Sequence, residues 1–302
     1  MIDKKIAIII TTKDRLNELK LTLKKISDLI QNDNVECLIC DDGSIDGTSE
    51  FIRNNYPNIQ LIHNTTSRGL IFSRNRLMAA TNATYVISLD DDAHFVSTQI
   101  LETIEEFFNS HQRCAVISFR LYWGKILPNT IKVNEKPYKT RSFLGGANAF
   151  RMEAWKEIPE FPIWFMFHGE EDFASYHLLK NNWQIWYVPK IFAHHRVDMS
   201  KRKQQKDYIL RLRRSLRSGW YLYLLFYPLY LVPRKILYSI YIQLKTKVFK
   251  GDFKAFSAIL QALGDVIVNS PRLIKNRKAL SREELKSYHS LPPTKIYWQP
   301  HE

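Results

Sequence analysis

Three short apolar segments, at residues 5–10, 36–40 and 85–89, each run directly into a polar or acidic turn. Their length and nearly continuous apolar character are typical of strands that are buried on both faces of a parallel sheet. Between the segments, apolar residues recur at three- and four-residue intervals, most clearly over residues 16–30, and this is the spacing of a helix. Because strand and helix alternate with short connections, we predict an α/β fold with a mostly parallel sheet flanked by helices.

The turn that follows residues 85–89 consists of three adjacent carboxylates, Asp90, Asp91 and Asp92. In open α/β sheets, ligands bind in the crevice beyond the carboxyl ends of the strands. Adjacent carboxylates repel one another unless a cation offsets their charge, and Mg²⁺ or Mn²⁺ takes oxygen ligands and bridges carboxylates to substrate phosphates. We therefore interpret the cluster as a metal–diphosphate site. The alternative is a solvated turn rich in aspartate.

A second acidic turn, at residues 41–48, favours the metal site, and further motifs follow it along the chain. Taken in order, the motifs resemble those of a family 2 inverting glycosyltransferase with the GT-A fold, a Rossmann-like α/β fold. The first four motifs fall within the first 92 residues, which makes the combination specific. The resemblance rests on residues 11–15, 41–48, 74–76, 89–92, 145–148 and 169–172, together with His194 and His195.

The resemblance implies how a nucleotide sugar would be held. Thr11 and Asp42 would contact its base, with Asp42 accepting the imide hydrogen of a uracil or thymine. Asp91 would lie by the ribose, and Asp92 would hold a divalent metal, Mg²⁺ or Mn²⁺, on the diphosphate. The predicted donor site also includes Arg15, Asp90 and Gly146. The backbone of a glycine lets a sugar approach closely, although a plain tight turn is the alternative for Gly146.

Two further assignments from the resemblance concern charge on the diphosphate and the metal. Arg68 or Arg74 could neutralise phosphate oxygens through bidentate hydrogen bonds, although Arg74 lies in a helical pattern that also allows a surface or packing role. A histidine near the end of the last predicted strand can reach the metal. Because adjacent strand residues point in opposite directions, at most one of His194 and His195 would do so, and we assign the ligand to His194. A hydrogen-bonded structural histidine is the alternative.

An inverting transfer needs a carboxylate that takes the proton of the attacking acceptor hydroxyl. Glu170, Glu171 and Asp172 are the candidates, and they follow an aromatic stretch at residues 161–169 that could exclude water and raise a carboxyl pKa. Asp172 fits the letters of the Glu-Asp pair that the family uses, whereas counting back from the strand predicted at residues 183–188 favours Glu171. Both residues remain candidates. Alternatively, the acids only cap the helix that follows them.

The positive charge of the chain is confined to its last third. The formal net charge is +14, and residues 196–302 hold 22 of the 44 Lys and Arg residues but only 7 of the 30 Asp and Glu residues. This region therefore carries +15, and residues 1–195 sum to −1. Such a basic block indicates nucleic acid, an anionic membrane surface or a solvated helix face.

The apolar content of the basic region decides among these partners. Residues 220–232 form an aromatic and apolar run of 13 residues that no nucleic-acid-binding arm would need. The run is shorter than the roughly 20 residues that span a bilayer, and its Trp and Tyr residues favour the membrane interface. We predict that residues 201–302 form a basic amphipathic helical region on an anionic membrane. A small helical cap on the catalytic domain, residues 1–200, is the alternative.

Cysteine usage and the start of the chain bear on location. Cys37 and Cys40 lie in a predicted strand, where alternation places them on opposite faces, so we predict reduced thiols rather than a redox pair. The charged residues 3–5 lead at once into the first predicted strand without a secretory signal. We expect a cytoplasmic protein that is attached peripherally to the inner face of the cell membrane.

These observations predict a glycosyltransferase that moves a sugar from a UDP- or dTDP-type donor to a lipid-linked or glycan acceptor in cell-surface polysaccharide synthesis. Two other classes are weighed against it. A nucleotidyltransferase would be expected to carry a glycine-rich phosphate loop near the first strand, which residues 11–15 lack. A non-catalytic membrane-bound protein that only binds a sugar nucleotide would not need the carboxylates at residues 170–172.

Overall fold

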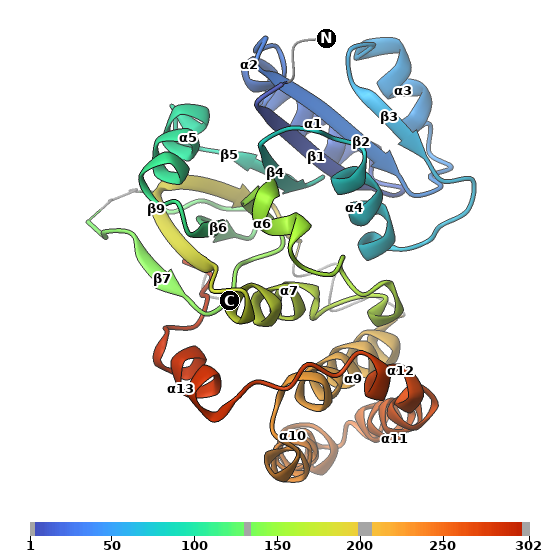
Figure 1. Ribbon diagram of the computed structural model, residues 1–302. Helices are drawn as coiled ribbons and strands as arrows, with labels where there is room; N and C mark the ends of the chain where they lie inside the picture. Colours follow the sequence, from blue (N-terminus) through green and yellow to red (C-terminus); the bar gives the residue numbers. More distant parts are fainter. Residues whose placement is uncertain (1–3, 130–133, 199–206, 298–302) are drawn as a thin grey trace.

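The computed structural model describes residues 4–129, 134–198 and 207–297 of the chain. A nine-stranded sheet with helices on both faces forms its main part, and C-terminal helices pack beneath this α/β unit (Figure 1). The strands are β1 (Ile6–Thr12), β2 (Val35–Asp41), β3 (Gln60–His63), β4 (Tyr85–Asp90), β5 (Ala93–Phe95), β6 (Cys114–Trp123), β7 (Tyr138–Thr140), β8 (Ala147–Arg151) and β9 (Gln184–His195). The helices of this unit are α1 (Leu16–Lys25), α2 (Ser27–Ile30), α3 (Thr48–Asn55), α4 (Leu70–Ala79), α5 (Ile100–Ser110), α6 (Met152–Lys156), the 3₁₀ turn η1 (Ile163–Phe165) and α7 (Glu170–Lys180).

The order of the strands across the sheet is β3-β2-β1-β4-β8-β6-β9-β5, with β7 paired to β9. Strands β3, β2, β1 and β4 are parallel, as is the β6–β9 pair, whereas β8 runs antiparallel between β4 and β6. In this register Thr11 lies opposite Cys40 on one side and Asp90 on the other. The turns that follow β1, β2 and β4 therefore meet at one edge of the sheet. The mostly parallel sheet is confirmed.

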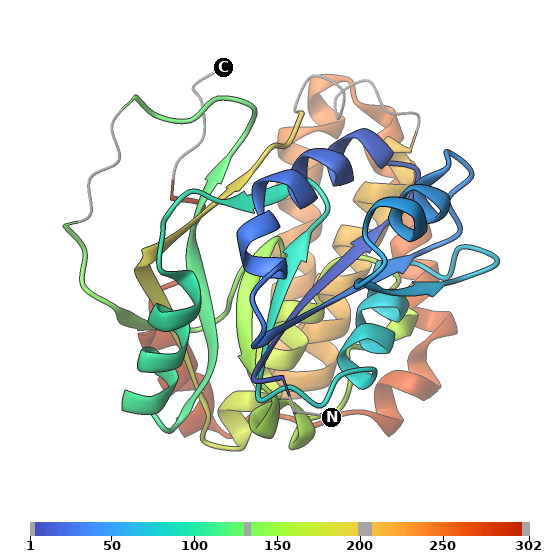
Figure 2. The same cartoon turned by 90° about the horizontal axis from the view of Figure 1, so that it is seen from above.

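Alternate residues of the strands face two separate apolar cores. One core contains Cys37 with the inner faces of α1, α3 and α5, and the other contains Cys40 with those of α4 and α7. The placement of these two cysteines on opposite faces is thus confirmed, and both are buried free thiols. Figure 2 shows the layers from above, with α1 and α3 on one side of the central strands and the C-terminal helices on the other.

The limits of two elements differ from the sequence prediction. α7 begins at Glu170, so the candidate acids lie inside its first turn, where the helix dipole favours negative charge. β9 continues beyond residue 188 to His195, because its pairing with β6 is interrupted between Val188 and Phe192 and then resumes. Pro189 lies in this interruption, where the missing N–H is tolerated.

The C-terminal helices are α9 (Tyr208–Phe226), α10 (Val232–Thr246), α11 (Phe253–Val268), α12 (Ser270–Lys275) and α13 (Arg282–Ser290), with the 3₁₀ turns η2 (Leu229–Leu231) and η3 (Val248–Lys250). α9 is the central element of this group. Its residues Tyr221 and Phe226 belong to the core of the α/β unit, whereas Leu216 and Trp220 pack against α11. Small residues of α11 line the second contact and let the helices approach closely. They are Ala255, Ala258 and Ala262.

The structure corrects the role predicted for residues 220–232. Trp220, Tyr221, Leu225 and Phe226 are at most 1% exposed, because they pack against the α/β unit and α11. This part of the run forms the helical cap that was the alternative to membrane insertion. None of the described helices combines enough length with enough apolar character to cross a bilayer. The predicted domain boundary at residue 200 lies outside the described residues.

Phe226→Ala should lower the free energy of unfolding by about 3–5 kcal/mol, the usual range for removing a buried aromatic ring. Phe226 is fully buried and stacks on Tyr176 of α7, so the C-terminal helices and the α/β unit should unfold together in a urea titration followed by circular dichroism. The control Phe249→Ala removes a ring that is 75% exposed and should change stability by less than about 0.5 kcal/mol. An early, separate transition of the C-terminal helices would contradict the shared core.

Candidate active site

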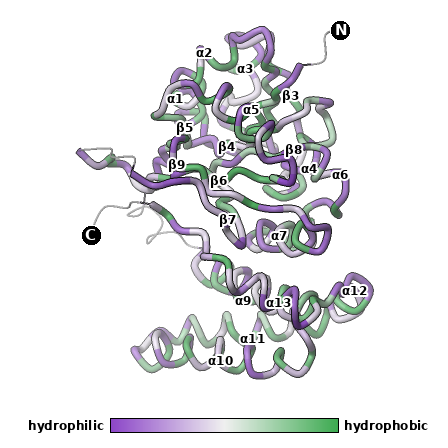
Figure 3. Tube along the Cα trace, turned by 60° about the vertical axis from the view of Figure 1, so that its left-hand side comes forward, coloured by the Kyte–Doolittle hydropathy of each residue, from purple (hydrophilic) through white to green (hydrophobic). Residues whose placement is uncertain are grey.

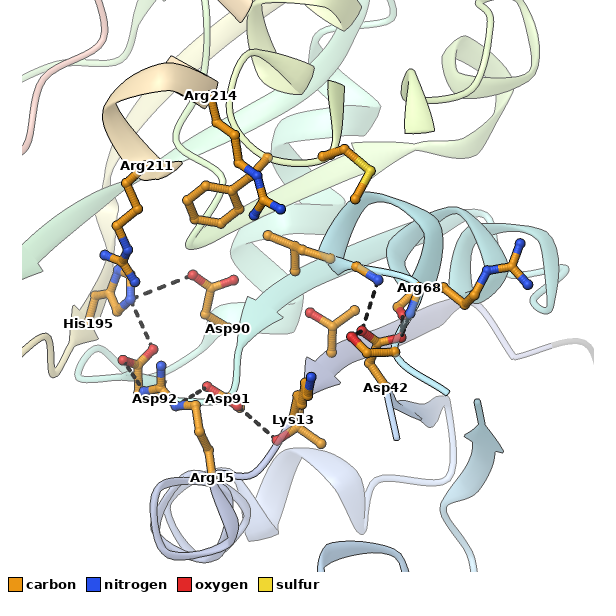
Figure 4. Close-up of a pocket in the computed structure, with 18 residues that line it drawn as sticks. Lys13, Arg15, Asp42, Arg68, Asp90, Asp91, Asp92, His195, Arg211 and Arg214 are labelled. Atoms are coloured by element: carbon orange, nitrogen blue, oxygen red, sulfur yellow. Dashed lines mark hydrogen bonds and ion pairs between the residues drawn. The ribbon is translucent and has the colours of Figure 1, made fainter. Parts of the chain in front are cut away.

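A cavity of about 590 Å³ opens at the edge of the sheet where the turns after β1, β2 and β4 meet (Figure 4). This volume lies in the range of small-molecule and cofactor sites. Two predicted residues that do not line the cavity, Arg74 and Gly146, contact the lining residue Asp90. The predicted residues that do line it are Thr11, Arg15, Asp42, Arg68, Asp90, Asp91 and Asp92.

Asp91 is buried beneath the cavity and is held by β1 and α1. Thr12 Oγ1 donates a 2.8 Å hydrogen bond to its carboxylate, and Thr22 Oγ1 donates to its backbone carbonyl. Arg15 Nε lies 3.2 Å from the carboxylate. Burial raises the pKa of Asp91 to about 7, and the charge of Asp92 adds to this effect while Arg15 opposes it. Asp91 thus joins the turn after β4 to strand β1 and helix α1.

Asp92 is also buried, but it keeps its negative charge. Its carboxylate lies 2.9 Å from Nε2 of His195 and forms an ion pair with Arg15. Burial opposes ionisation here too, yet the hydrogen bond and charge of His195 and the charge of Arg15 hold the pKa of Asp92 well below its usual range. These contacts favour the anionic form of the carboxylate, which is the form that binds a metal ion.

Asp90, Asp92 and His195 form the group that could hold a metal ion. One ligand atom from each lies within 4.8 Å of the others, and Asp90 Oδ2 is 3.6 Å from Nε2 of His195. Two carboxylates with one imidazole suit Mg²⁺ or Mn²⁺, which accept oxygen ligands and leave further positions to substrate phosphates. The arrangement can therefore bind a divalent cation at the wall of the cavity.

The structure places His194, the predicted metal ligand, away from this group. Its Nε2 is 2.7 Å from the carbonyl oxygen of Gly124, and its ring packs edge-to-face on His94. Because adjacent strand residues alternate in direction, it is His195 that faces Asp92. The choice between the two histidines could not be made from the residues alone, since the interruption in β9 sets which of them points to the cavity.

Asp42 lines the cavity, but both of its carboxylate oxygens already accept hydrogen bonds. The donors are the backbone N–H groups of Arg68 and Gly69 at 2.8 and 2.9 Å, and side chains of the same loop and of the first turn of α4. These side chains are Asn64, Ser67 and Ser73. Although burial opposes it, these bonds lower the pKa of Asp42. In this structure Asp42 shapes the loop that leads into α4, and its predicted contact with a base stays a prediction.

The two arginines predicted for the diphosphate are engaged elsewhere. Arg74 is buried, with its guanidinium 3.3 Å from Asp90, 3.5 Å from Glu170 and 3.4 Å from the carbonyl of Gly145. It therefore supports the metal group from behind, close to the packing role that was its alternative. The guanidinium of Arg68 lies over the ring of Phe72 and points away from the aspartates (Figure 4).

The two glycines at residues 145 and 146 allow groups to crowd against the backbone. A Cβ atom at Gly146 would lie 2.8 Å from Nδ1 of His195 and 3.3 Å from Asp90. A Cβ atom at Gly145 would clash with Oε1 of Glu171. A side chain at Gly146 would press on the metal group, and one at Gly145 would force the carboxylate of Glu171 to move.

The three candidate acids of α7 point in different directions. Glu170 is buried against Arg74, and Glu171 lies against Gly145. Asp172 instead hydrogen-bonds Ser142 and lies near Arg141. Burial raises the pKa of Glu171 well above its ordinary value, and the charge of Glu170 adds to the shift. Glu171 is thus the acid that borders the glycine turn beside the metal group.

Among the lining residues that sequence reasoning missed are four that come from two segments later in the chain. Met166 and Phe167 come from the loop before α7, and Arg211 and Arg214 come from α9. Phe167 belongs to the aromatic stretch that the sequence predicts to exclude water. Arg211 and Arg214 belong to the basic region that the sequence predicts to face a membrane, and nothing in their sequence context distinguishes them as cavity residues.

The fold and the carboxylate group define a GT-A glycosyltransferase, and three solved structures share the fold. The mannosyltransferase PcManGT from Pyrobaculum calidifontis is 15% identical over 95% of this chain, with a TM-score of 0.55. GalNAc-T7 is 11% identical over 89% (TM-score 0.60), and TarS from S. aureus is 17% identical over 69% (TM-score 0.54). The alignments span 79%, 57% and 38% of those chains.

The sequence profile of Glycosyl transferase family 2 matches residues 7–167, more than half of the chain. The protein therefore belongs to glycosyl transferase family 2. This membership confirms the resemblance inferred from the motifs and excludes the nucleotidyltransferase alternative. Among curated proteins, no sequence matches the chain.

His195→Ala should weaken Mn²⁺ binding by at least about tenfold, since even the loss of a residue that only supports a metal ligand costs 10- to 100-fold in metal affinity. Titration calorimetry with Mn²⁺ measures the effect. His194→Ala is the matched control, because its ring faces Gly124 and His94, and its Mn²⁺ affinity should equal that of the unmodified protein. A selective loss in the His194 variant would reverse the assignment.

Proposed function

We propose that the protein is an inverting glycosyltransferase that moves a sugar from a nucleoside diphosphate donor, of the UDP or dTDP type, with the help of Mg²⁺ or Mn²⁺. The observation that carries the proposal is the grouping of Asp90, Asp92 and His195 at the wall of a nucleotide-sized cavity. PcManGT was solved with GDP-Man and Mn²⁺, and GalNAc-T7 with UDP, GalNAc and Mn²⁺. Both support a metal-bound nucleotide sugar as the class of donor.

The residues in and around the cavity would have different roles in holding the donor. A divalent cation bound to Asp90, Asp92 and His195 would stabilise the charge that develops on the departing diphosphate. Arg15 fixes the ionised Asp92 in place, and Arg74 positions Asp90 from behind. These two guanidinium groups offset the repulsion between the carboxylates, so the carboxylates can stay close together before any ligand enters.

Glu171 is the residue that we propose as the general base. It borders Gly145, and the adjacent Gly146 borders Asp90 and His195, so the base and the leaving-group site lie on two sides of one glycine turn. A raised pKa makes Glu171 a stronger proton acceptor once it is ionised. Asp172 turns toward Ser142 and Arg141 instead, which favours the register obtained by counting back from β9.

Glu171→Gln should lose at least the roughly hundredfold in rate that a positioned general base supplies, while Mn²⁺-dependent nucleotide binding stays intact. Asp172→Asn, the matched control, should keep its rate. The assay is release of nucleoside diphosphate from UDP-, dTDP- and GDP-sugars with Mn²⁺, in which water replaces the acceptor. Equal rates in both variants would remove Glu171 from its role. Donor binding without any turnover in the unmodified chain would favour the non-catalytic alternative.

An exposed apolar face on the C-terminal helices supports attachment to a membrane. It runs over η2, α10, η3 and α11, on the side that faces away from the α/β unit, and Figure 3 shows α10 and α11 on this outer side. The residues of this face, each at least 46% exposed, are Leu229, Tyr230, Leu237, Tyr238, Tyr241, Phe249, Phe253, Phe256, Leu260 and Ile267. Large exposed apolar side chains that gather on neighbouring helices in this way favour an interaction site.

The charges beside this face favour an anionic bilayer. Exposed basic residues flank it, namely Lys245, Lys250, Lys254, Arg272 and Lys275. Apolar and aromatic side chains ringed by lysine and arginine bind at the headgroup boundary of anionic lipids. We therefore propose a cytoplasmic enzyme on the inner face of the cell membrane, with a lipid-linked or glycan acceptor of cell-surface polysaccharide synthesis. Of residues 220–232, which the sequence predicted for the membrane, Leu229 and Tyr230 belong to this face, and its other residues lie on α10, η3 and α11.

Phe249→Ser and Phe253→Ser combined should reduce co-sedimentation with anionic vesicles, because two exposed apolar side chains leave the bilayer contact. Lys250→Glu and Lys254→Glu combined should weaken binding more at low than at high salt, since salt screens the contribution of about 1 kcal/mol per basic residue. Ile45→Ser, at an exposed site in the α/β unit, is the control. If the unmodified chain stays in the supernatant at low salt, the face binds something other than a membrane.

A further inference from the structure

We propose that Arg211 and Arg214 of α9 bind the diphosphate of the nucleotide, so that the C-terminal helices supply part of the donor site. The proposal rests on the proposed function and adds residues to it. Both side chains line the cavity together with Asp90, Asp92 and His195. Figure 4 shows the two guanidinium groups directed into the cavity from the side opposite β1 and α1. A diphosphate held at the metal group would therefore lie between the carboxylates and α9.

The arginines of α9 fall into two sets on different faces of the helix. Arg211 and Arg214 are three residues apart and share the face that meets the cavity. Arg213 and Arg217 share another face and pair with Asp265 of α11, at 2.7 Å and 3.3 Å. The second set fastens α9 to α11, whereas the first set has the cavity in front of it.

The other cations near the cavity are less suited to the diphosphate. Arg15 is paired with Asp91 and Asp92, Arg74 is buried behind Asp90, and Arg68 points away over Phe72. Lys13 lines the cavity as well, on the side of β1. A nucleoside diphosphate therefore finds its planar, bidentate partners on α9, and guanidinium groups match phosphate oxygens in that geometry.

The surroundings of the two arginines are consistent with an anion between them and the metal group. Burial lowers the pKa of Arg214, and the charges of Arg217 and Arg213 act in the same direction. A bound anion would relieve this repulsion. Arg211 pairs with Asp207 one turn earlier, at 2.8 Å, and a half-exposed pair of this spacing is weak enough to exchange for a phosphate.

The test compares binding of nucleoside, monophosphate and diphosphate by titration calorimetry on the full chain with Mn²⁺. The series is uridine, UMP and UDP, repeated for thymidine and guanosine, and the base that binds is used for the variants. Arg211→Gln and Arg214→Gln should each weaken diphosphate binding about ten- to a hundredfold, as expected for loss of a charge-assisted hydrogen bond. Nucleoside affinity should stay unchanged, so the gain from the second phosphate should shrink.

Two control variants separate the outcomes. Arg53→Gln removes an exposed arginine of α3 and should bind like the unmodified protein, whereas Arg213→Gln breaks the pair with Asp265 and should lower the melting temperature without a selective loss of diphosphate. The inference fails if both cavity variants bind diphosphate normally, or if nucleoside affinity falls by the same factor. If the unmodified chain binds none of the diphosphates, the proposed function itself fails.

Discussion

Arg15 holds two adjacent buried carboxylates, Asp91 and Asp92, at the edge of the sheet, and the rest of the site depends on this pairing. Without a cation between them, two buried acids in sequence would repel each other and titrate. Two further contacts stabilise these carboxylates. Thr12 of β1 donates a hydrogen bond to Asp91, and His195 at the end of β9 pairs with Asp92. The network therefore fixes three separate stretches of chain against one another. Despite burial, the contacts of His195 and Arg15 lower the pKa of Asp92, whereas burial raises that of Asp91 against the opposing charge of Arg15.

The C-terminal helices are part of the enzyme's body rather than an appendage to it. α9 contributes Tyr221 and Phe226 to the core of the α/β unit, and its cavity face carries Arg211 and Arg214. Its third side packs on α11, whose outer surface is apolar. One helix thus contacts the core, the donor cavity and the helix that bears the proposed membrane face. The basic residues of this region form a single block in the sequence, but in the structure they lie at the cavity, at the contact between α9 and α11, and on the exposed outer face.

The sequence predicted the sheet and its acidic edge well because strands buried on both faces are nearly continuous in apolar residues, and Asp90 to Asp92 follow one of them directly. Choices that depend on direction were harder. His194 and His195 point to opposite faces of β9, and the interruption at Pro189 sets which of them points toward the cavity. Glu171 and Asp172 differ by one step at the start of α7. Arg211 and Arg213 are the same type of residue in the same basic segment, but Arg211 lines the cavity and Arg213 pairs with Asp265. The packing of α9, and not charge, decides which of them faces the cavity.

The position of the cavity arginines depends on three alanines of α11 that do not line the cavity. Because Ala255, Ala258 and Ala262 are fully buried against α9, the distance between the two helices is set by the smallest side chains that the contact allows. A larger residue there would displace α9 and carry its arginines with it. If the outer side of α11 rests on a bilayer, lateral pressure in the lipid would act on α11 and, through it, on α9 and the cavity. Donor affinity would then depend on lipid composition.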